Sequence, residues 1–207
     1  MLISAECYRD MYLKNESEDF ILGEVSTLLA EIKRLKYKME TPYYEFEEHP
    51  YPAEREQLAA CRSYLEKARE ELNSRGGDFD VFSIFSDEEK MREKLNGLKK
   101  ISVVIGVSER YIATSDGEKF DITTEKDGQK REGVSEKQTL LHKLFDIRIS
   151  EWRSVYLPKD YGWVEPSPMP WEVVIDFENG ENCVTYSGIS VYPYNFASFI
   201  EIFNPVV

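Results

Sequence analysis

Apolar residues in the first third of the chain recur at helical spacing. Two series alternate steps of three and four positions: Ile21, Val25, Leu28, Ile32, Leu35 and Met39, and then Leu58, Cys61, Leu65, Ala68 and Leu72. This heptad spacing places each series on one face of an α-helix. Because only a short loop separates the two series, we expect an antiparallel helical hairpin within residues 1–77.

Residues with capping preferences mark where these helices begin. Ser17 precedes two acidic residues and predicts the start of the first long helix, because its hydroxyl can satisfy a free backbone N–H and acids favour the first turn. Pro52 suits the first turn of the second long helix. Ser4 predicts a short helix over residues 5–14, with an apolar side made by Tyr8, Met11 and Tyr12.

From about residue 78 the pattern changes to short β-rich runs separated by turn residues. Strands are expected over 101–107, 110–114, 118–124, 171–177 and 182–186. The strand at 171–177 has apolar residues at alternate positions, so that one of its faces is expected to be buried. Asp-Gly pairs at 116–117 and 127–128 predict turns, and the charged stretch 126–132 is expected to be a solvated loop.

Helical patterns interrupt these strands. Helices are expected over 86–98, after Ser135, and after Asn195, where one apolar face would be formed by Phe196, Phe199, Ile200 and Phe203. Residues 78–207 therefore predict an antiparallel β-sheet with flanking helices. Together with the hairpin, they give the chain an α+β fold.

Charge and cysteine usage narrow the class of protein. The 207 residues include 39 acidic and 26 basic side chains, a net charge of −13, and from Tyr161 onward no Lys or Arg occurs. Such a surface repels phosphate backbones, so we expect no direct nucleic-acid binding; a basic protein partner fits it, and so does solubility alone. No signal peptide or membrane-spanning stretch is visible, and three widely spaced cysteines do not form a disulfide framework. We expect a cytoplasmic protein that does not associate with membranes.

Motifs that carry chemistry are absent from the sequence. It has no phosphate-binding loop, nucleophile elbow or zinc-protease motif. A cysteine nucleophile would need a histidine base; only Cys183 and His142 share a predicted domain, and a mid-strand Cys183 would be poorly presented. Asp176 and Glu178 lie on the polar side of a strand, where solvation is the expected role. We therefore expect no metal, no cofactor and no catalytic residue, without deciding whether an enzyme activity exists.

Two groups of residues are candidates for binding. The segment 41–52 is rich in proline, aromatic and acidic residues, and its candidate contacts are Tyr43, Tyr44, Phe46, Glu47 and Glu48. Aromatic side chains dominate protein interfaces, although these rings could instead fold back onto the protein. The second group is Trp152, Arg153 and Tyr156, in which Arg153 could hold an anion, or pair with an internal carboxylate while stacking on Trp152 or Trp171.

The last third of the chain also has a fixed arrangement of Trp, Tyr, Gly and Pro. It contains E-W-R at 151–153, Y-G at 161–162, a Trp-led strand at 171, N-G at 179–180 and Y-P-Y-N-F at 192–196. With I-S-A-E-x-Y-R-x-x-Y-L at 3–13 and L-x-x-E-I-x-R-L-K at 28–36, this pattern resembles a family of uncharacterised bacterial proteins. The resemblance implies a shared fold and a common site near the Trp/Tyr/Arg cluster, and it implies no particular activity.

Three functions are compatible with these observations. The first is a non-enzymatic, acidic protein-binding module, an inhibitor or accessory factor that engages a basic protein surface. The second is a small-molecule-binding protein or enzyme centred on Arg153 and its aromatic neighbours. The third is a structural homo-oligomer assembled through the heptad face, and the sequence leaves the oligomeric state open.

Overall fold

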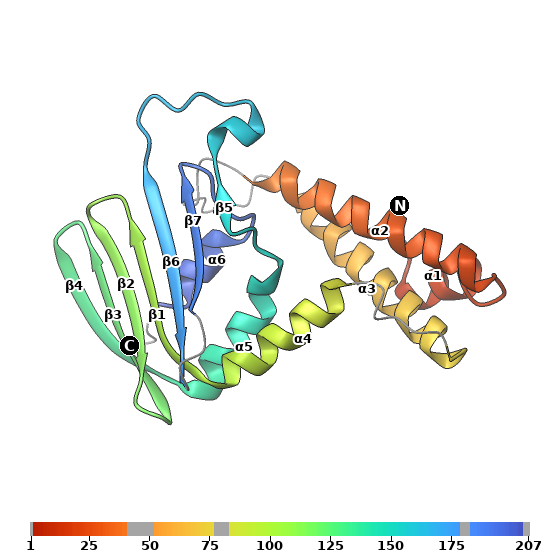
Figure 1. Ribbon diagram of the computed structural model, residues 1–207, viewed down its shortest axis with the longest axis horizontal. Helices are drawn as coiled ribbons and strands as arrows, with labels where there is room; N and C mark the ends of the chain where they lie inside the picture. Colours follow the sequence, from red (N-terminus) through yellow and green to blue (C-terminus); the bar gives the residue numbers. More distant parts are fainter. Residues whose placement is uncertain (1, 41–51, 77–82, 179–182, 205–207) are drawn as a thin grey trace. The chain divides into compact units, whose positions relative to one another are not determined.

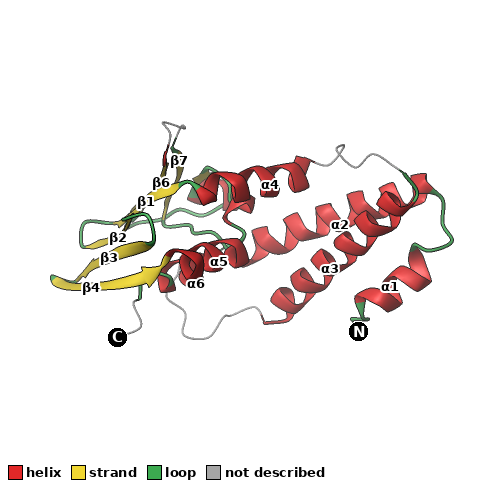
Figure 2. Cartoon of the chain, turned by 90° about the horizontal axis from the view of Figure 1, so that it is seen from below, coloured by secondary structure: helices red, strands yellow, loops and turns green. Residues whose placement is uncertain are grey.

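The structure is a computed structural model of the chain that describes residues 2–40, 52–76, 83–178 and 183–204. In these ranges six α-helices and a seven-stranded sheet confirm the expected α+β fold (Figures 1 and 2). The chain divides into two compact units. The helical unit contains the first three helices, and the sheet unit extends from Ile84 onward.

The helical unit is built from α1 (Ala5–Tyr12), α2 (Glu18–Met39) and α3 (Pro52–Ser74). Every residue of both heptad series is buried, which confirms the hairpin prediction. The helices α2 and α3 run antiparallel: Lys38, near the end of α2, pairs with Glu54, near the start of α3. Farther from this end, Gln57 Nε2 donates to Glu31 Oε1 at 2.8 Å.

The predicted caps of this unit are present. Ser4 Oγ accepts a hydrogen bond from the backbone N–H of Cys7 at 3.2 Å, and Ser17 Oγ accepts one from that of Phe20 at 3.3 Å. The predicted apolar side of α1 is wrong at two positions, because Met11 is 61% and Tyr12 is 44% exposed. The helix ends at Tyr12, so the chain turns there, and Tyr8 and Leu13 are the buried side chains.

An ion-pair cluster connects the C-terminal end of α3 to α1 and to the turn that follows α1. The carboxylate of Glu71 on α3 accepts from Arg9 Nε of α1 at 3.0 Å and from Arg75 Nη2 at 2.8 Å. Arg75 also donates to the backbone carbonyls of Leu13 and Lys14, and so connects α3 to the turn after α1. These contacts, led by that of Arg75, hold the pKa of Glu71 below its ordinary value, against the opposing effect of burial.

The sheet unit contains one seven-stranded sheet in the order β4-β3-β2-β1-β6-β7-β5. Its main strands are β1 (Leu98–Ile105), β2 (Glu109–Ser115), β3 (Lys119–Lys126), β4 (Gln129–Glu136), β6 (Pro170–Phe177) and β7 (Val184–Ile189). All of these pair antiparallel, and the two-residue edge strand β5 (Val155–Tyr156) pairs parallel with β7. The helices are α4 (Ser83–Asn96), α5 (Lys137–Ile147) and α6 (Phe196–Glu201), with short 3₁₀ turns at Ile149–Glu151 and Pro158–Tyr161.

One face of the sheet is buried and the other is open. The predicted alternation of β6 is confirmed, because Trp171, Val173, Ile175 and Phe177 are all buried. They belong to one core with leucines of α5 and phenylalanines of α6, which lie on the same side of the sheet (Figure 1). The β6 residues between them in the sequence face the opposite side of the sheet, which we call the open face. Glu172 of β6 and Val104 of β1 lie on this face and are exposed.

Two sequence predictions fail around β4. The stretch 126–132 is not a loop: Asp127 and Gly128 have φ of 53° and 75°, which makes a two-residue turn, and β4 begins at Gln129. Ser135 lies in β4 and does not cap α5, whose N-cap is Glu136 without a side-chain bond. The charges at 130–132 resemble those of a loop, yet on an edge strand they oppose pairing with other chains. Elsewhere in this unit, helix α4 begins at Ser83, three residues before its predicted start at residue 86.

Candidate functional site

The first predicted candidate, Trp152, is a core residue. It is 6% exposed, and its Nε1 donates to Asn195 Oδ1 at 2.8 Å. Asn195 in turn donates to the carbonyl of Ile147, so its side chain connects α5 to the start of α6. Asn195 occupies the N-cap position of α6, as expected, but its side chain makes no capping hydrogen bond. The ring of Trp152 also contacts Phe196 and Phe199. The E-W-R and Y-P-Y-N-F motifs therefore meet inside the protein.

Arg153 and Tyr156 lie next to each other but face different environments. Tyr156 is 1% exposed, and its hydroxyl accepts from the backbone N–H of Arg153 at 3.0 Å. The exposed guanidinium of Arg153 lies 4.5 Å from the ring centroid of Tyr156 and 5.2 Å from that of Tyr161. The rings in these two contacts are tyrosines, whereas the sequence suggested Trp152 or Trp171. None of the three is among the lining residues of the hollows described below.

Trp171 and Gly188 form a second fixed contact in the core. They are opposite each other on β6 and β7, and a Cβ at position 188 would lie 2.5 Å from Trp171 Nε1. The indole N–H donates to the carbonyl of Val191 at 2.7 Å. Only glycine leaves room for the ring here, so Gly188 and the Trp171 of the motif pattern serve packing.

A neighbouring tyrosine shows the same structural use of polar groups. The hydroxyl of Tyr186 donates to the backbone carbonyl of Ile149 at 3.0 Å. Burial raises the pKa of Tyr186 to about 12, because the charged phenolate would be poorly solvated. This group stays neutral at physiological pH and holds the turn after α5 in place.

The other chemical candidates lie apart. Cys183 is exposed and precedes β7, so its predicted position in the middle of a strand is wrong. His142 is exposed on α5 and lies 3.7 Å from Asp146. Among residues 2–40, 52–76, 83–178 and 183–204, no three His, Cys, Asp or Glu side chains are placed to hold a metal ion. The candidate loop residues Tyr43, Tyr44, Phe46, Glu47 and Glu48 lie outside the described residues.

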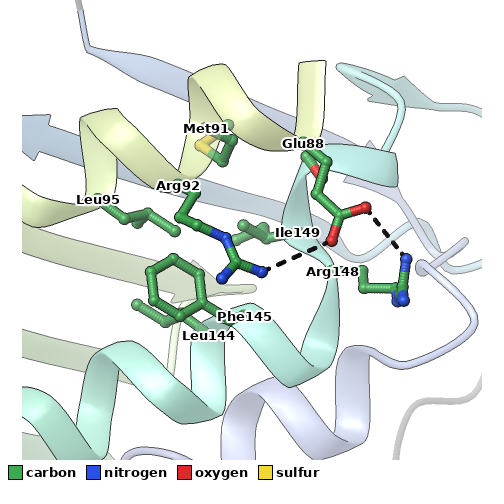
Figure 3. A pocket seen from close by; sticks show the side chains of 9 residues that line it. Glu88, Met91, Arg92, Leu95, Leu144, Phe145, Arg148 and Ile149 are labelled. Carbon is green, nitrogen blue, oxygen red and sulfur yellow. Dashed lines mark hydrogen bonds and ion pairs between the residues drawn. The ribbon is translucent and has the colours of Figure 1, made fainter. Parts of the chain in front are cut away.

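A small cavity between α4 and the end of α5 contains a group of paired charges (Figure 3). Glu88 lies between Arg148, at 3.2 Å, and Arg92, at 4.0 Å, and Arg92 also covers the ring of Phe145 at 4.9 Å. Arg148 further pairs with Glu151 at 3.7 Å. The volume of about 10 Å³ holds about one water molecule. This cluster connects α4 to α5 and has no room for a substrate.

Two larger hollows that are lined by described residues lie at one end of the open face. One has a volume of about 450 Å³ and lies over β1, β6, β7 and β5, with Val104, Val155, Leu157, Glu172 and Ile189 among its lining residues. The second, of about 580 Å³, is bounded by the turn after β1 and by the proline-rich segment Pro166–Pro170. The two share Gly106 and Pro170, and together we call them the open-face groove.

Exposed apolar side chains are concentrated at this groove. Seven large ones belong to the described part of the sheet unit: Val104, Val107, Val134, Val155, Trp163, Val164 and Met169. Four of them line the groove, and Trp163 and Val164 lie in the segment that leads to it. Only Val134, on β4, is elsewhere. Sequence reasoning missed this site, although the repeated prolines at 166, 168 and 170 were a visible signal of a special segment.

The wall of the groove is tied to the sheet by backbone bonds. The N–H of Gly106 donates to the carbonyl of Pro170 at 2.8 Å. Met169 donates its N–H to Ser190 Oγ at 2.8 Å and accepts from the N–H of Ser190 at 2.9 Å. Ser190 is buried and has a φ of 50°. Residues other than glycine adopt this conformation only at a cost in free energy, and the hydrogen bonds with Met169 hold it here. The proline-rich segment is therefore fixed at its C-terminal end.

Charges along the groove are acidic. Its charged lining residues are Glu109 and Glu172. Glu109 accepts from the hydroxyl of Tyr111 at 2.8 Å and lies 3.6 Å from Lys126. Glu172 is exposed and makes no side-chain hydrogen bond or ion pair with the residues that the structure describes. The groove can therefore offer apolar contacts beside one unpaired carboxylate.

Comparisons with known proteins leave the function to be argued from this geometry. No protein-family model matches the chain, and neither the curated proteins nor the solved structures contain a significant match to it. None of the helices in the described ranges combines the length and apolar character needed to cross a membrane.

Proposed function

We propose that this protein is a non-enzymatic protein-binding module that engages a basic surface of a partner protein through the open-face groove. The observation that carries the proposal is the concentration of exposed apolar side chains at the groove. Contiguous apolar surface is costly to leave in water and is typical of interaction sites.

Charge supports the same class of partner. The chain has a net charge of −13, and no Lys or Arg lines either hollow. An acidic surface speeds association with a cationic partner and disfavours acidic competitors. The fixed wall also helps, since a site that is already ordered loses less entropy on binding.

The other two functions have less support in the geometry. Arg153 has its guanidinium over Tyr156 and Tyr161, and this contact already provides a role for its charge. The heptad residues of α2 and α3 pack within the helical unit, so that assembly through them would require the hairpin to open. The loop with Tyr43, Tyr44 and Phe46 remains a predicted second part of the binding surface.

A peptide-display selection tests the proposal directly. Random linear peptides are selected on the full-length protein and are then measured on two variants, Val155→Arg and Val134→Arg. Both valines are exposed, at 47% and 53%, and both face the open side, but Val155 lines the groove and Val134 lies on the opposite edge strand. We expect the selected peptides to be enriched in basic and apolar residues and to lose affinity at least tenfold on Val155→Arg only. Equal binding to both variants, or no enrichment, would refute the proposed function.

A further inference from the structure

Glu172 lies in a row of paired residues that crosses the floor of the groove and includes two exposed valines. Strand pairing places Val104 of β1 opposite Glu172 of β6, Glu172 opposite Ser187 of β7, and Ser187 opposite Val155 of β5. With neighbouring strands about 4.8 Å apart, Val104 lies about 5 Å and Val155 about 10 Å from Glu172. The carboxylate therefore has an exposed valine directly beside it on β1, and a second one beyond Ser187 on β5.

Within the described residues, Glu172 has no ion pair with a Lys, Arg or His side chain. Arg110, the nearest cation along the row, is opposite Val104 on β2 and is therefore two strands from Glu172. It makes no ion pair with Glu172. The other lining carboxylate, Glu109, already has Tyr111 and Lys126 as partners. Glu172 is thus the lining charge that is available to a ligand.

We infer that the groove binds an extended peptide segment in which one Lys or Arg side chain, flanked by aliphatic residues, pairs with Glu172. This inference rests on the proposed function and names the feature of the partner that the groove recognises. A Lys or Arg side chain matches the site because its methylene stem packs on apolar walls while its head reaches the carboxylate. A peptide that covers Glu172 removes part of the water around the carboxylate, and this strengthens the attraction above that of a fully exposed pair.

The second hollow favours a peptide over a small amine. It adjoins the first at Gly106 and Pro170 and presents Val107, Pro168 and Met169. A free amine would fill only the region around Glu172. A peptide can place its cation there and its next apolar side chains against the proline-rich segment, and it then uses both hollows.

The test uses capped heptapeptides and the full-length protein. The probe is Gly-Ile-Val-Lys-Val-Ile-Gly, and its controls have the central lysine replaced by acetyl-lysine, norleucine or glutamate. Binding is measured by fluorescence anisotropy on the wild type, on Glu172→Gln, and on Asp176→Asn. Asp176 lies on the same strand and the same face as Glu172 but outside the groove lining, and it is opposite Lys100.

We expect the lysine peptide to bind the wild type about tenfold more tightly than the acetyl-lysine and norleucine peptides, and the glutamate peptide to bind worst. Glu172→Gln should abolish this preference and leave the norleucine peptide unchanged, whereas Asp176→Asn should keep it. Higher ionic strength should weaken only the lysine peptide. Melting curves check that both variants fold.

Three results overturn the inference. Equal affinity for the lysine and norleucine peptides would show that Glu172 does not select a cation. If that equal binding is still lost on Val155→Arg, the proposed function stands even though the inference fails. Cadaverine binding as tightly as the lysine peptide would show that the ligand is a small amine. No binding of the lysine peptide also overturns it, and the display selection then decides separately whether the proposed function fails.

Discussion

Asn195 holds together two segments that are far apart in the sequence, and its removal should be costly. Its side chain accepts a hydrogen bond from Trp152 Nε1 and donates one to the carbonyl of Ile147, and both hydrogen bonds are buried. In Asn195→Ala, the indole N–H and the carbonyl lose their partner, and each orphaned buried group costs about 1–3 kcal/mol. We therefore expect a loss of about 3 kcal/mol in the free energy of unfolding.

The magnitude can be checked by two independent measurements. Urea denaturation gives the change in unfolding free energy, and for a unit of this size about 3 kcal/mol corresponds to a fall of roughly 10 °C in melting temperature. Hydrogen exchange should show faster exchange in the segments around residues 147–152 and 195–199. Asn204→Ala is the matched control, because Asn204 is exposed and its loss should change stability by less than about 0.5 kcal/mol.

A double-mutant cycle tests the physical cause. Trp152→Phe removes the indole donor, so that combining it with Asn195→Ala should cost less than the sum of the two single changes. Strict additivity would show that the two side chains do not depend on each other. A single-variant loss below about 1 kcal/mol would show that water satisfies the freed groups, and it would refute the cost of orphaned groups assumed here.

Three further predictions follow from the packing and charge of the two units. Leu65→Ala should lower stability by about 2–5 kcal/mol in urea denaturation, because it leaves a cavity in the hairpin core, and an unchanged midpoint would contradict the heptad packing. Gly188→Ala should lower the melting temperature because its Cβ meets Trp171, whereas Gly23→Ala, on an exposed helix face with nothing within 4 Å, should raise stability by roughly 0.5–1 kcal/mol; similar shifts for both variants would contradict this. The pKa of Glu71 is lowered in the folded state, so its pairs stabilise above the ordinary glutamate pKa of about 4.3 and the effect is lost as pH falls toward the lowered value. Urea midpoints between pH 3 and pH 7 should therefore fall less at the acid end for Glu71→Gln than for the wild type, and parallel profiles would refute the assignment.

The fold was predictable wherever burial imposes a period on the sequence. The two heptad series and the alternation of β6 were read correctly because one face of each element is buried and the other is not. The edge strand β4 lacks this contrast, since its residues 129–132 are all exposed, and its charges resemble those of a loop. The turn at Asp127-Gly128 was recognised, but the strand that it begins was not.

The candidate site was much less predictable than the fold. Aromatic residues next to an arginine suggest a binding site and a buried cluster equally well, and here Trp152 and Tyr156 belong to the core. The groove, in contrast, is lined by four separate parts of the chain, at 104–109, 155–157, 166–172 and 187–189. No local period distinguishes a valine exposed in a groove from a valine in the core, so only the assembled sheet brings these residues together.

The residues of the motif pattern and those of the groove are adjacent in the sequence, and this arrangement links stability to binding. On β5, Tyr156 points into the core while Val155 lines the groove, and on β6 the buried Trp171 is followed by the exposed Glu172. The rings of Tyr156 and Trp171 lie 5.7 Å apart inside the protein. Because side chains alternate along a strand, fixing the inner ring also fixes the position of its outer neighbour. The aromatic core can therefore hold the groove in a binding-ready shape, and changes at Glu172 should alter the choice of partner while leaving that shape intact.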